Sequence, residues 1–145
     1  MLFASCSRPL VLAALLLGTA TTGALAADLT VSVSGVRDAS QSIRIALYAD
    51  AATFRHEADA RQVLTLPAAK GTVSGVFRDL PPGRYAVLAY HDENGNGKLD
   101  MILGMLPDEG WGLSNDPTVI GPPRFEASAF EVSEPEAAVT VPLHY

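Results

Sequence analysis

Hydrophobic and polar residues alternate one by one along several short segments of this 145-residue chain. In segment 29–34, for example, Leu29, Val31 and Val33 alternate with threonine and serine residues. Successive side chains of a β-strand point to opposite faces of a sheet, so this period of two predicts strands with one buried and one exposed face. The same pattern occurs in segments 43–50, 73–77, 85–91 and 137–145. The chain is therefore expected to fold mainly as β-strands.

Weaker strand candidates at 63–66 and 130–132 bring the expected number of short strands to about seven. The apolar positions change parity between Phe125 and Phe130, which predicts a bulge or a loop at that point. Short strands separated by turn residues predict an all-β fold, an antiparallel two-sheet sandwich with Greek-key connections. Segment 50–62 is rich in alanine without a long apolar stripe, so we expect one short helix after the second strand.

Two residues predict details of this sandwich. Pro142 falls on the polar face of the last strand, where it removes a hydrogen-bond donor. We therefore expect that strand at a sheet edge, or bulged near its end. Tyr85 follows a Pro-Pro-Gly turn at the start of a strand, as in the tyrosine corner of Greek-key sandwiches. Its hydroxyl is expected to bond a backbone group of the turn rather than to take part in catalysis.

Residues 1–26 are organised as a secretory signal peptide. Arg8 precedes an apolar run, and the small residues Ala24 and Ala26 predict cleavage after Ala26. The run is shorter than the roughly 20 residues that span a bilayer, which argues against the alternative of an uncleaved anchor. We expect residues 27–145 to form a single exported β-sandwich domain, periplasmic or extracellular, without a membrane span.

Charge and cysteine content argue against several classes of function. The chain has 16 acidic against 10 basic residues and a net charge of −6. This balance argues against the basic surface that binding of nucleic acid or adhesion to anionic lipid requires. The single cysteine, Cys6, would leave with the signal peptide, so disulfides, thiolate zinc sites and a cysteine nucleophile are not expected.

The segment that follows strand 85–91 has the spacing of a calcium-binding loop. Short oxygen-bearing side chains occupy positions one, three, five and nine of this loop, and these are Asp92, Asn94, Asn96 and Asp100. Gly97 at position six allows a sharp turn, and Lys98 at position seven offers its backbone carbonyl. We expect a calcium ion here, since Ca²⁺ takes six to eight oxygen ligands. The alternative is a metal-free turn in which Asp and Asn side chains cap backbone amides.

The loop departs from an EF-hand at position twelve, where Leu103 stands in place of a bidentate glutamate. A further oxygen has to come from the following segment, and Glu109 is the candidate, with Asp108 and Asp116 as alternatives. With so few carboxylates we expect weak affinity, with a dissociation constant of about 10⁻⁴ to 10⁻³ M. Such an ion would brace the loop rather than catalyse a reaction.

Segment 104–117 is rich in glycine and proline, so we expect it to be an irregular loop that faces a ligand or partner. Trp111 stands between two glycines and could stack on a ring or a sugar, or pack beneath its own loop. The residues expected to contact a ligand or partner are His91, Trp111, Ser114 and Asn115. The partner is expected to be a glycan, a peptide or an envelope protein.

Several stretches together resemble a known family, namely 82–87, 91–100, 109–115 and 123–126. The family is a group of secreted bacterial proteins catalogued as domain of unknown function 2141. The most specific stretch is His-Asp-Glu-Asn-Gly-Asn-Gly-Lys-Leu-Asp at 91–100, followed by Glu-Gly-Trp-Gly at 109–112. The resemblance covers nearly the whole mature chain and implies export and a transthyretin-like or immunoglobulin-like sandwich. It supplies no established activity.

Within the chain no residue pattern identifies a catalytic site or a site for an organic cofactor. The leading hypothesis is therefore a non-catalytic binding or accessory module. The alternative is a periplasmic hydrolase or transthyretin-like enzyme that uses His91 with Asp92, Glu109 or Ser114. That alternative predicts that these side chains converge in one pocket.

Overall fold

The structure is a computed structural model that describes residues 25–145, so Cys6 and nearly all of the predicted signal peptide lie outside the described residues. The described part is mostly β-structure. Its strands are β1 (Ala27–Val36), β2 (Ser42–Tyr48), β3 (Gln62–Pro67), β4 (Gly71–Leu80), β5 (Gly83–Asp92), β6 (Met101–Ile102), β7 (Leu106–Pro107), β8 (Trp111–Leu113), β9 (Phe130–Val132) and β10 (Glu136–Pro142). A short 3-10 helix, η1 (Glu57–Asp59), and a four-residue α-helix, α1 (Phe125–Ser128), complete it. Between residues 25 and 145 no helix is long and apolar enough to cross a membrane.

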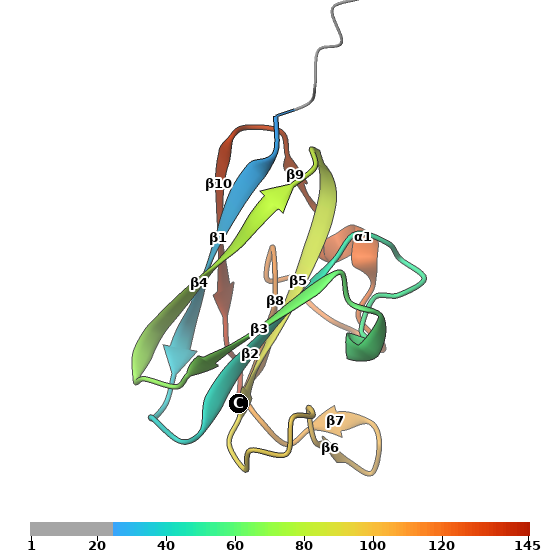
Figure 1. The fold of residues 1–145 in the computed structure, drawn as a ribbon. Coiled ribbons are helices and arrows are strands. Elements are labelled where there is room, and N and C mark those ends of the chain that lie inside the picture. Colours follow the sequence, from blue (N-terminus) through green and yellow to red (C-terminus); the bar gives the residue numbers. More distant parts are fainter. Residues whose placement is uncertain (1–24) are drawn as a thin grey trace, which may run out of the picture.

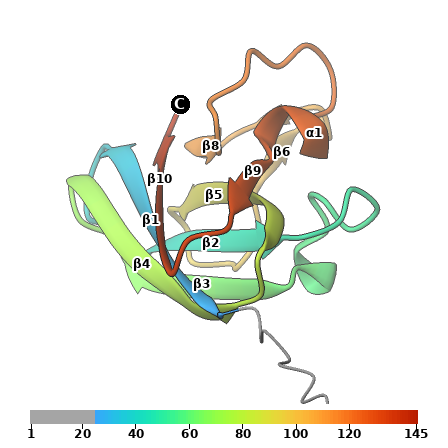
Figure 2. The ribbon, with the colours of Figure 1, turned by 90° about the horizontal axis from the view of Figure 1, so that it is seen from above.

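Two main sheets form the body of the protein (Figures 1 and 2). One has the strand order β10-β1-β4, and the other has the order β3-β2-β5-β8, with β9 also paired to β5. The pairs within the second sheet are antiparallel, as the sequence predicts. The expectation of a purely antiparallel fold is wrong at one edge, because β1 and β10 run parallel. Alternation of apolar residues specifies the faces of a strand but not its direction.

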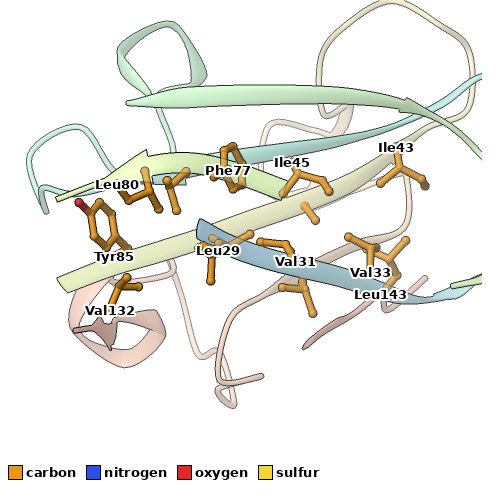
Figure 3. Packing of buried hydrophobic residues seen from close by; sticks show 14 of the residues in the cluster. Leu29, Val31, Val33, Ile43, Ile45, Phe77, Leu80, Tyr85, Val132 and Leu143 are labelled. Atoms are coloured by element: carbon orange, nitrogen blue, oxygen red, sulfur yellow. The ribbon is translucent and has the colours of Figure 1, made fainter. Parts of the chain in front are cut away.

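The apolar faces of the predicted strands meet between the two sheets in a sandwich-like arrangement. Leu29, Val31 and Val33 of β1 are fully buried across from Ile43 and Ile45 of β2 (Figure 3). The remaining buried members of this core include Phe77, Leu80, Tyr85, Val87, Ala89, Val132, Val141 and Leu143. Burial of apolar surface, worth about 25 cal/mol per Å², is the main force that holds the sheets together.

Strand β5 is buried on both faces, although its alternation predicts a half-buried strand. Tyr85, Val87 and Ala89 belong to the core between the sheets, whereas the residues between and after them, 86, 88 and 90, belong to a second cluster. In this second cluster Phe54 packs edge-on against both Tyr48 and Phe125, with ring centroids 5.3 and 5.9 Å apart. The segment after β2 and helix α1 therefore cover the outer face of the sheet.

The structure corrects three local expectations. Segment 50–62, expected to contain a turn or two of helix, forms turns and the short η1. The change of parity before Phe130 is caused by α1 rather than by a bulge or loop. Segment 104–117 is not wholly irregular, because it contains β7 and β8, and β8 pairs with β5. The part of this glycine-rich segment that forms β8 is extended because it pairs with β5, a strand that lies far away in the sequence.

Two other expectations are confirmed. The hydroxyl of Tyr85 donates a hydrogen bond to the carbonyl oxygen of Pro81 at 2.6 Å, which is the contact of a tyrosine corner. Pro142 is the last residue of β10, and β10 is the edge strand of its sheet. At that position the missing amide donor of proline leaves the sheet intact.

The glycines on either side of Trp111 are required by the close approach of the C-terminal segment. The backbones of Trp111 and His144 exchange two hydrogen bonds, of 2.9 and 2.8 Å. A Cβ atom on Gly112 would lie 2.0 Å from the carbonyl oxygen of Pro142, and one on Gly110 would lie 2.2 Å from the ring of Tyr145. Because the obstacle at Gly112 is backbone, a side chain there cannot be accommodated by a change of rotamer.

Gly112→Ala should therefore destabilise the protein by about 3 kcal/mol or more, because β8 and the end of β10 would have to separate. Urea denaturation measures the loss. The matched control is Gly83→Ala, whose added Cβ would lie 3.8 Å from its nearest neighbour, a ring carbon of Tyr85. This control should change the free energy of unfolding by less than about 0.5 kcal/mol. Equal effects of the two substitutions would contradict the steric explanation.

Candidate functional site

Strand β5 ends at Asp92, and the predicted calcium loop, residues 92–100, begins there at one end of the molecule (Figure 1). The carboxylate of Asp92 accepts hydrogen bonds from the backbone amides of Asn96 and Gly97, at 3.0 and 2.9 Å. Asp92 is buried, so these two amides replace the water that the carboxylate loses. Gly95 and Gly97 have φ values of 74° and 73°, which glycine adopts without steric cost. The last residue of a buried strand thus folds the loop around its own side chain.

Three other side chains of the loop meet at one point. The side-chain amides of Asn94 and Asn96 both donate to Oδ2 of Asp100, at 2.5 and 2.8 Å. Their amide oxygens accept from backbone amides, Asn94 from Asn96 at 3.0 Å and Asn96 from Lys98 at 2.9 Å. These are the hydrogen bonds of a metal-free turn. Rotation of each amide by about 180° would place its oxygen, in place of its nitrogen, beside the Asp100 carboxylate.

Glu109 ties two segments of the loop together. It is only 5% exposed, and its carboxylate accepts hydrogen bonds from the backbone amides of Glu93, at 3.0 Å, and Asp100, at 3.2 Å. Burial raises the pKa of Glu109 above its usual value. The negative charges of Asp100 and Asp92 raise this pKa further, whereas the two amide donors lower it. The three carboxylates therefore create a negative potential that a bound cation would relieve.

A cation in this loop would depend on neutral oxygens as well as carboxylates. Within residues 25–145 no three His, Cys, Asp or Glu side chains are grouped so that they could hold a metal by themselves. The amide oxygens of Asn94 and Asn96 and the backbone carbonyl of Lys98 would have to complete the ligand set of Asp100. Hard oxygen ligands of this kind suit Ca²⁺ and do not suit softer transition metals.

The three residues considered as a further ligand lie in different places. Glu109 contacts the loop, as described above. Asp108 is exposed, and its backbone amide donates to the carbonyl oxygen of Asp100 at 2.8 Å. Asp116 is paired with His144 at 2.7 Å on another part of the surface. Of the three, Glu109 is the one whose carboxylate is bonded to the loop.

His91 precedes the loop and is fully buried. Its Nε2 lies 2.8 Å from the carbonyl oxygen of Ser40, which can only accept, so Nε2 carries a hydrogen. Its Nδ1 lies within hydrogen-bond distance, 3.0 Å, of the hydroxyl of Tyr145. The oxygen of the same hydroxyl accepts a separate hydrogen bond from the backbone amide of Arg37 at 3.2 Å. Both ring nitrogens of His91 are thus engaged within the protein, and contact with a ligand would require this end of the sandwich to open.

Ser114 and Asn115 connect β8 to its neighbours. Ser114 is fully buried, and its hydroxyl oxygen accepts from the amide of Val87 at 2.9 Å and bonds the carbonyl of Ser128. Asn115 is exposed, and its side-chain amide donates to the carbonyl oxygen of Ala129 at 2.9 Å. Of these two residues, Asn115 is the one that reaches the surface.

Trp111 is half-buried at the side of a shallow surface pocket of about 210 Å³. Leu113 and Val119 line the same pocket, and the pair formed by Asp116 and His144 supplies its polar side. An aromatic and apolar wall that faces a polar pair suits a small ligand with one apolar face and hydrogen-bonding groups. Trp111 also packs against the cluster around Phe54, so part of its side chain is used inside the fold.

The structure does not bring His91, Asp92, Glu109 and Ser114 into one pocket. Their polar atoms take part in separate hydrogen-bond networks, with Tyr145, with the loop amides and with β5. Sequence reasoning missed the contact between His91 and Tyr145, which joins residues 54 positions apart in the chain. The alternation of apolar and polar residues continues to Tyr145, and this was the one sequence signal that placed Tyr145 in a strand-like segment.

Comparison with known proteins gives a single kind of match. A family model described as "Uncharacterized protein conserved in bacteria (DUF2141)" matches residues 31–140. Neither a curated protein nor a solved structure matches the chain.

The pH dependence of stability should change in Glu109→Gln. A pKa that is raised in the folded state means that the neutral form of Glu109 is favoured there, so its contribution to stability is present at low pH and is lost as the pH rises through the raised pKa. In calcium-free buffer, the free energy of unfolding of the wild type relative to Glu109→Gln should therefore fall as the pH rises from the ordinary pKa of a glutamate carboxyl through the raised pKa of Glu109. Urea denaturation at a series of pH values measures this difference. A difference that stays constant or grows with pH would contradict the proposed cause.

Proposed function

The chain belongs to a bacterial family described only as uncharacterised, DUF2141, and we propose that it is an exported, non-catalytic binding or accessory module. In this proposal the loop 92–100 binds calcium weakly, and the segment 104–117 presents a surface to a ligand or partner. A Greek-key sandwich, transthyretin-like or immunoglobulin-like, is the fold that we propose to carry them.

The observation that supports calcium binding is the convergence of Asn94 and Asn96 on Oδ2 of Asp100. Alternate residues of a short turn bring their polar ends to one point, which is the arrangement that an oxygen-coordinated cation needs. The backbone around this point is already held by the carboxylates of Asp92 and Glu109. Binding would then require rotation of two side-chain amides rather than refolding of the loop.

The expected affinity is that of an extracellular calcium module, with a dissociation constant of about 10⁻⁴ to 10⁻³ M. At about 1 mM calcium and a dissociation constant of about 0.1 mM, the bound ion would stabilise the fold by about 1.4 kcal/mol. That contribution is too small to drive folding, but it is sufficient to brace one loop. A weak site of this kind suits the periplasm or the cell exterior better than a cytosolic sensor.

The proposed ligand surface is the pocket beside Trp111. Its aromatic wall and its polar pair, Asp116 and His144, favour a glycan, a peptide or an exposed side chain of an envelope protein. Export is proposed from the sequence of residues 1–26.

Calcium titration by isothermal calorimetry tests the proposal. The wild type should bind close to one calcium ion, and about 1 mM calcium should raise its melting temperature by about 5 °C. Asp100→Asn should weaken calcium binding by about tenfold or more, because this substitution removes the charge at the point where the side chains converge.

The matched control is Lys98→Ala, in the same loop. The proposal uses the backbone carbonyl of Lys98 and not its side chain, so this variant should bind calcium at least as well as the wild type. Absence of both a binding heat and a melting shift in the wild type would contradict the proposal and reduce the loop to a hydrogen-bonded turn.

A further inference from the structure

The β6–β7 hairpin is a projecting element to which the proposed function assigns no role. Its strands are joined by residues 103–105, and within this connection the carbonyl oxygen of Ile102 accepts a hydrogen bond from the amide of Met105 at 3.0 Å, which closes a β-turn. Both central residues of the turn, Leu103 and Gly104, have positive φ, 52° and 68°. Figure 1 shows the hairpin beside the loop that follows β5, at the same end of the molecule.

The side chains of this hairpin are apolar and open to solvent. Leu103, Met105 and Leu106 are 86%, 72% and 66% exposed, and Met101 and Ile102 are exposed as well. Single exposed apolar residues are common on protein surfaces, but a contiguous group of large ones marks an interaction site.

The arrangement of these side chains indicates what kind of surface they fit. Ile102 lies directly opposite Leu106, and Met101 lies opposite Pro107. Adjacent residues of a strand point to opposite faces, so apolar side chains occupy both faces of the hairpin as well as its tip. A protein groove or a second copy of the chain would cover one face and leave the other in water. The hydrocarbon boundary of a bilayer surrounds all sides of an inserted tip.

The residue at the tip is a poor choice for the turn itself. A β-turn with positive φ at both central positions favours asparagine followed by glycine, and a branched apolar residue is disfavoured at positive φ. Leu103 therefore makes the turn less stable than asparagine would. Leu103 is the most exposed of the large apolar side chains of the hairpin, and it is kept there at the expense of local stability, which indicates a role outside the fold.

Acidic residues surround the base of the hairpin. Asp100 precedes β6, and Asp108 and Glu109 follow β7. With an overall charge of −6, the protein without a cation would be repelled by anionic lipid. The apolar tip therefore needs a bound cation if it is to approach such a surface.

We propose that the tip of the β6–β7 hairpin inserts into the interfacial region of an anionic phospholipid bilayer, and that calcium in the loop 92–100 links the protein to the lipid phosphates. This inference rests on the proposed function, because it uses the same calcium ion. Even with Glu109, the ligand groups described above number five, which is fewer than the six to eight oxygens that Ca²⁺ takes, so the ligand shell of the ion is left incomplete. Lipid phosphates supply hard oxygen ligands that complete it, while the side chain of Leu103 enters the apolar layer.

Vesicle co-sedimentation tests this inference. The probes are vesicles of phosphatidylcholine alone and of phosphatidylcholine mixed with phosphatidylglycerol, each in about 1 mM calcium or in EGTA. The protein should sediment with the phosphatidylglycerol vesicles in calcium and remain in solution in EGTA. Because binding is reciprocal, these vesicles should also raise the calcium affinity measured by calorimetry.

The decisive variant is Leu103→Asn combined with Met105→Gln, which leaves the net charge unchanged. Its affinity for vesicles should fall by about tenfold or more, because buried Leu and Met side chains each contribute on that scale. Its calcium affinity without vesicles should stay the same, and Leu103→Asn alone should be at least as stable as the wild type. The matched control is Ile120→Asn, since Ile120 is 94% exposed but lies outside the hairpin, and this variant should bind vesicles normally.

Four results would overturn the inference. Calcium binding without vesicle binding would remove the lipid role and leave the proposed function intact, whereas absence of calcium binding would remove both. Equal vesicle binding in EGTA would exclude the calcium link. A dimer that forms on concentration and is abolished in the double variant, without vesicle binding, would assign the hairpin to a second copy of the chain.

Discussion

Burial of β5 on both faces is the constraint on which the rest of the structure depends. Its alternate side chains enter two different cores, so the strand needs a sheet against one face and a covering layer against the other. The sheet β10-β1-β4 covers one face of β5. The segment around Phe54, helix α1 and the side chain of Leu113 cover the other face. A strand held in this way has little freedom at its end. Asp92, the last residue of β5, therefore starts the loop 92–100 from a defined position.

The C-terminal segment connects the sandwich to the residues of the candidate site and of the surface pocket. It approaches β8 so closely that Gly112 has no room for a side chain, and its last residue, Tyr145, bonds the ring of His91. His144 pairs with Asp116 beside Trp111, so the same segment completes the surface pocket. A change in the packing of the C-terminal segment would thus alter the pocket, whereas the hydrogen bonds within the loop 92–100 do not involve it.

The loop 92–100 and the hairpin after it form one chemical unit. Glu109 follows the hairpin in the sequence, and its carboxylate accepts hydrogen bonds from backbone amides of the loop that precedes the hairpin. The pKa of Glu109 is raised by burial and by the neighbouring carboxylates. A cation would compensate this charge, and the exposed apolar tip would remain beside it. The proposals of calcium binding and of lipid contact therefore rest on two separate properties of neighbouring residues: excess negative charge at the base, and excess apolar surface at the tip.

The sequence by itself determined the strand-forming segments, the tyrosine corner at Tyr85 and membership of DUF2141, because these depend on local periodicity, local turn chemistry and a conspicuous run of residues. Tertiary structure alone decided the parallel pairing of β1 with β10, the second core and the extension of β8. It also decided that His91 and Ser114 are used inside the fold, and that the apolar residues after Asp100 stand in solvent. The physical reason is the same in each case: local patterns specify which faces of a segment are apolar, whereas the partner of each face is chosen by residues far away in the chain.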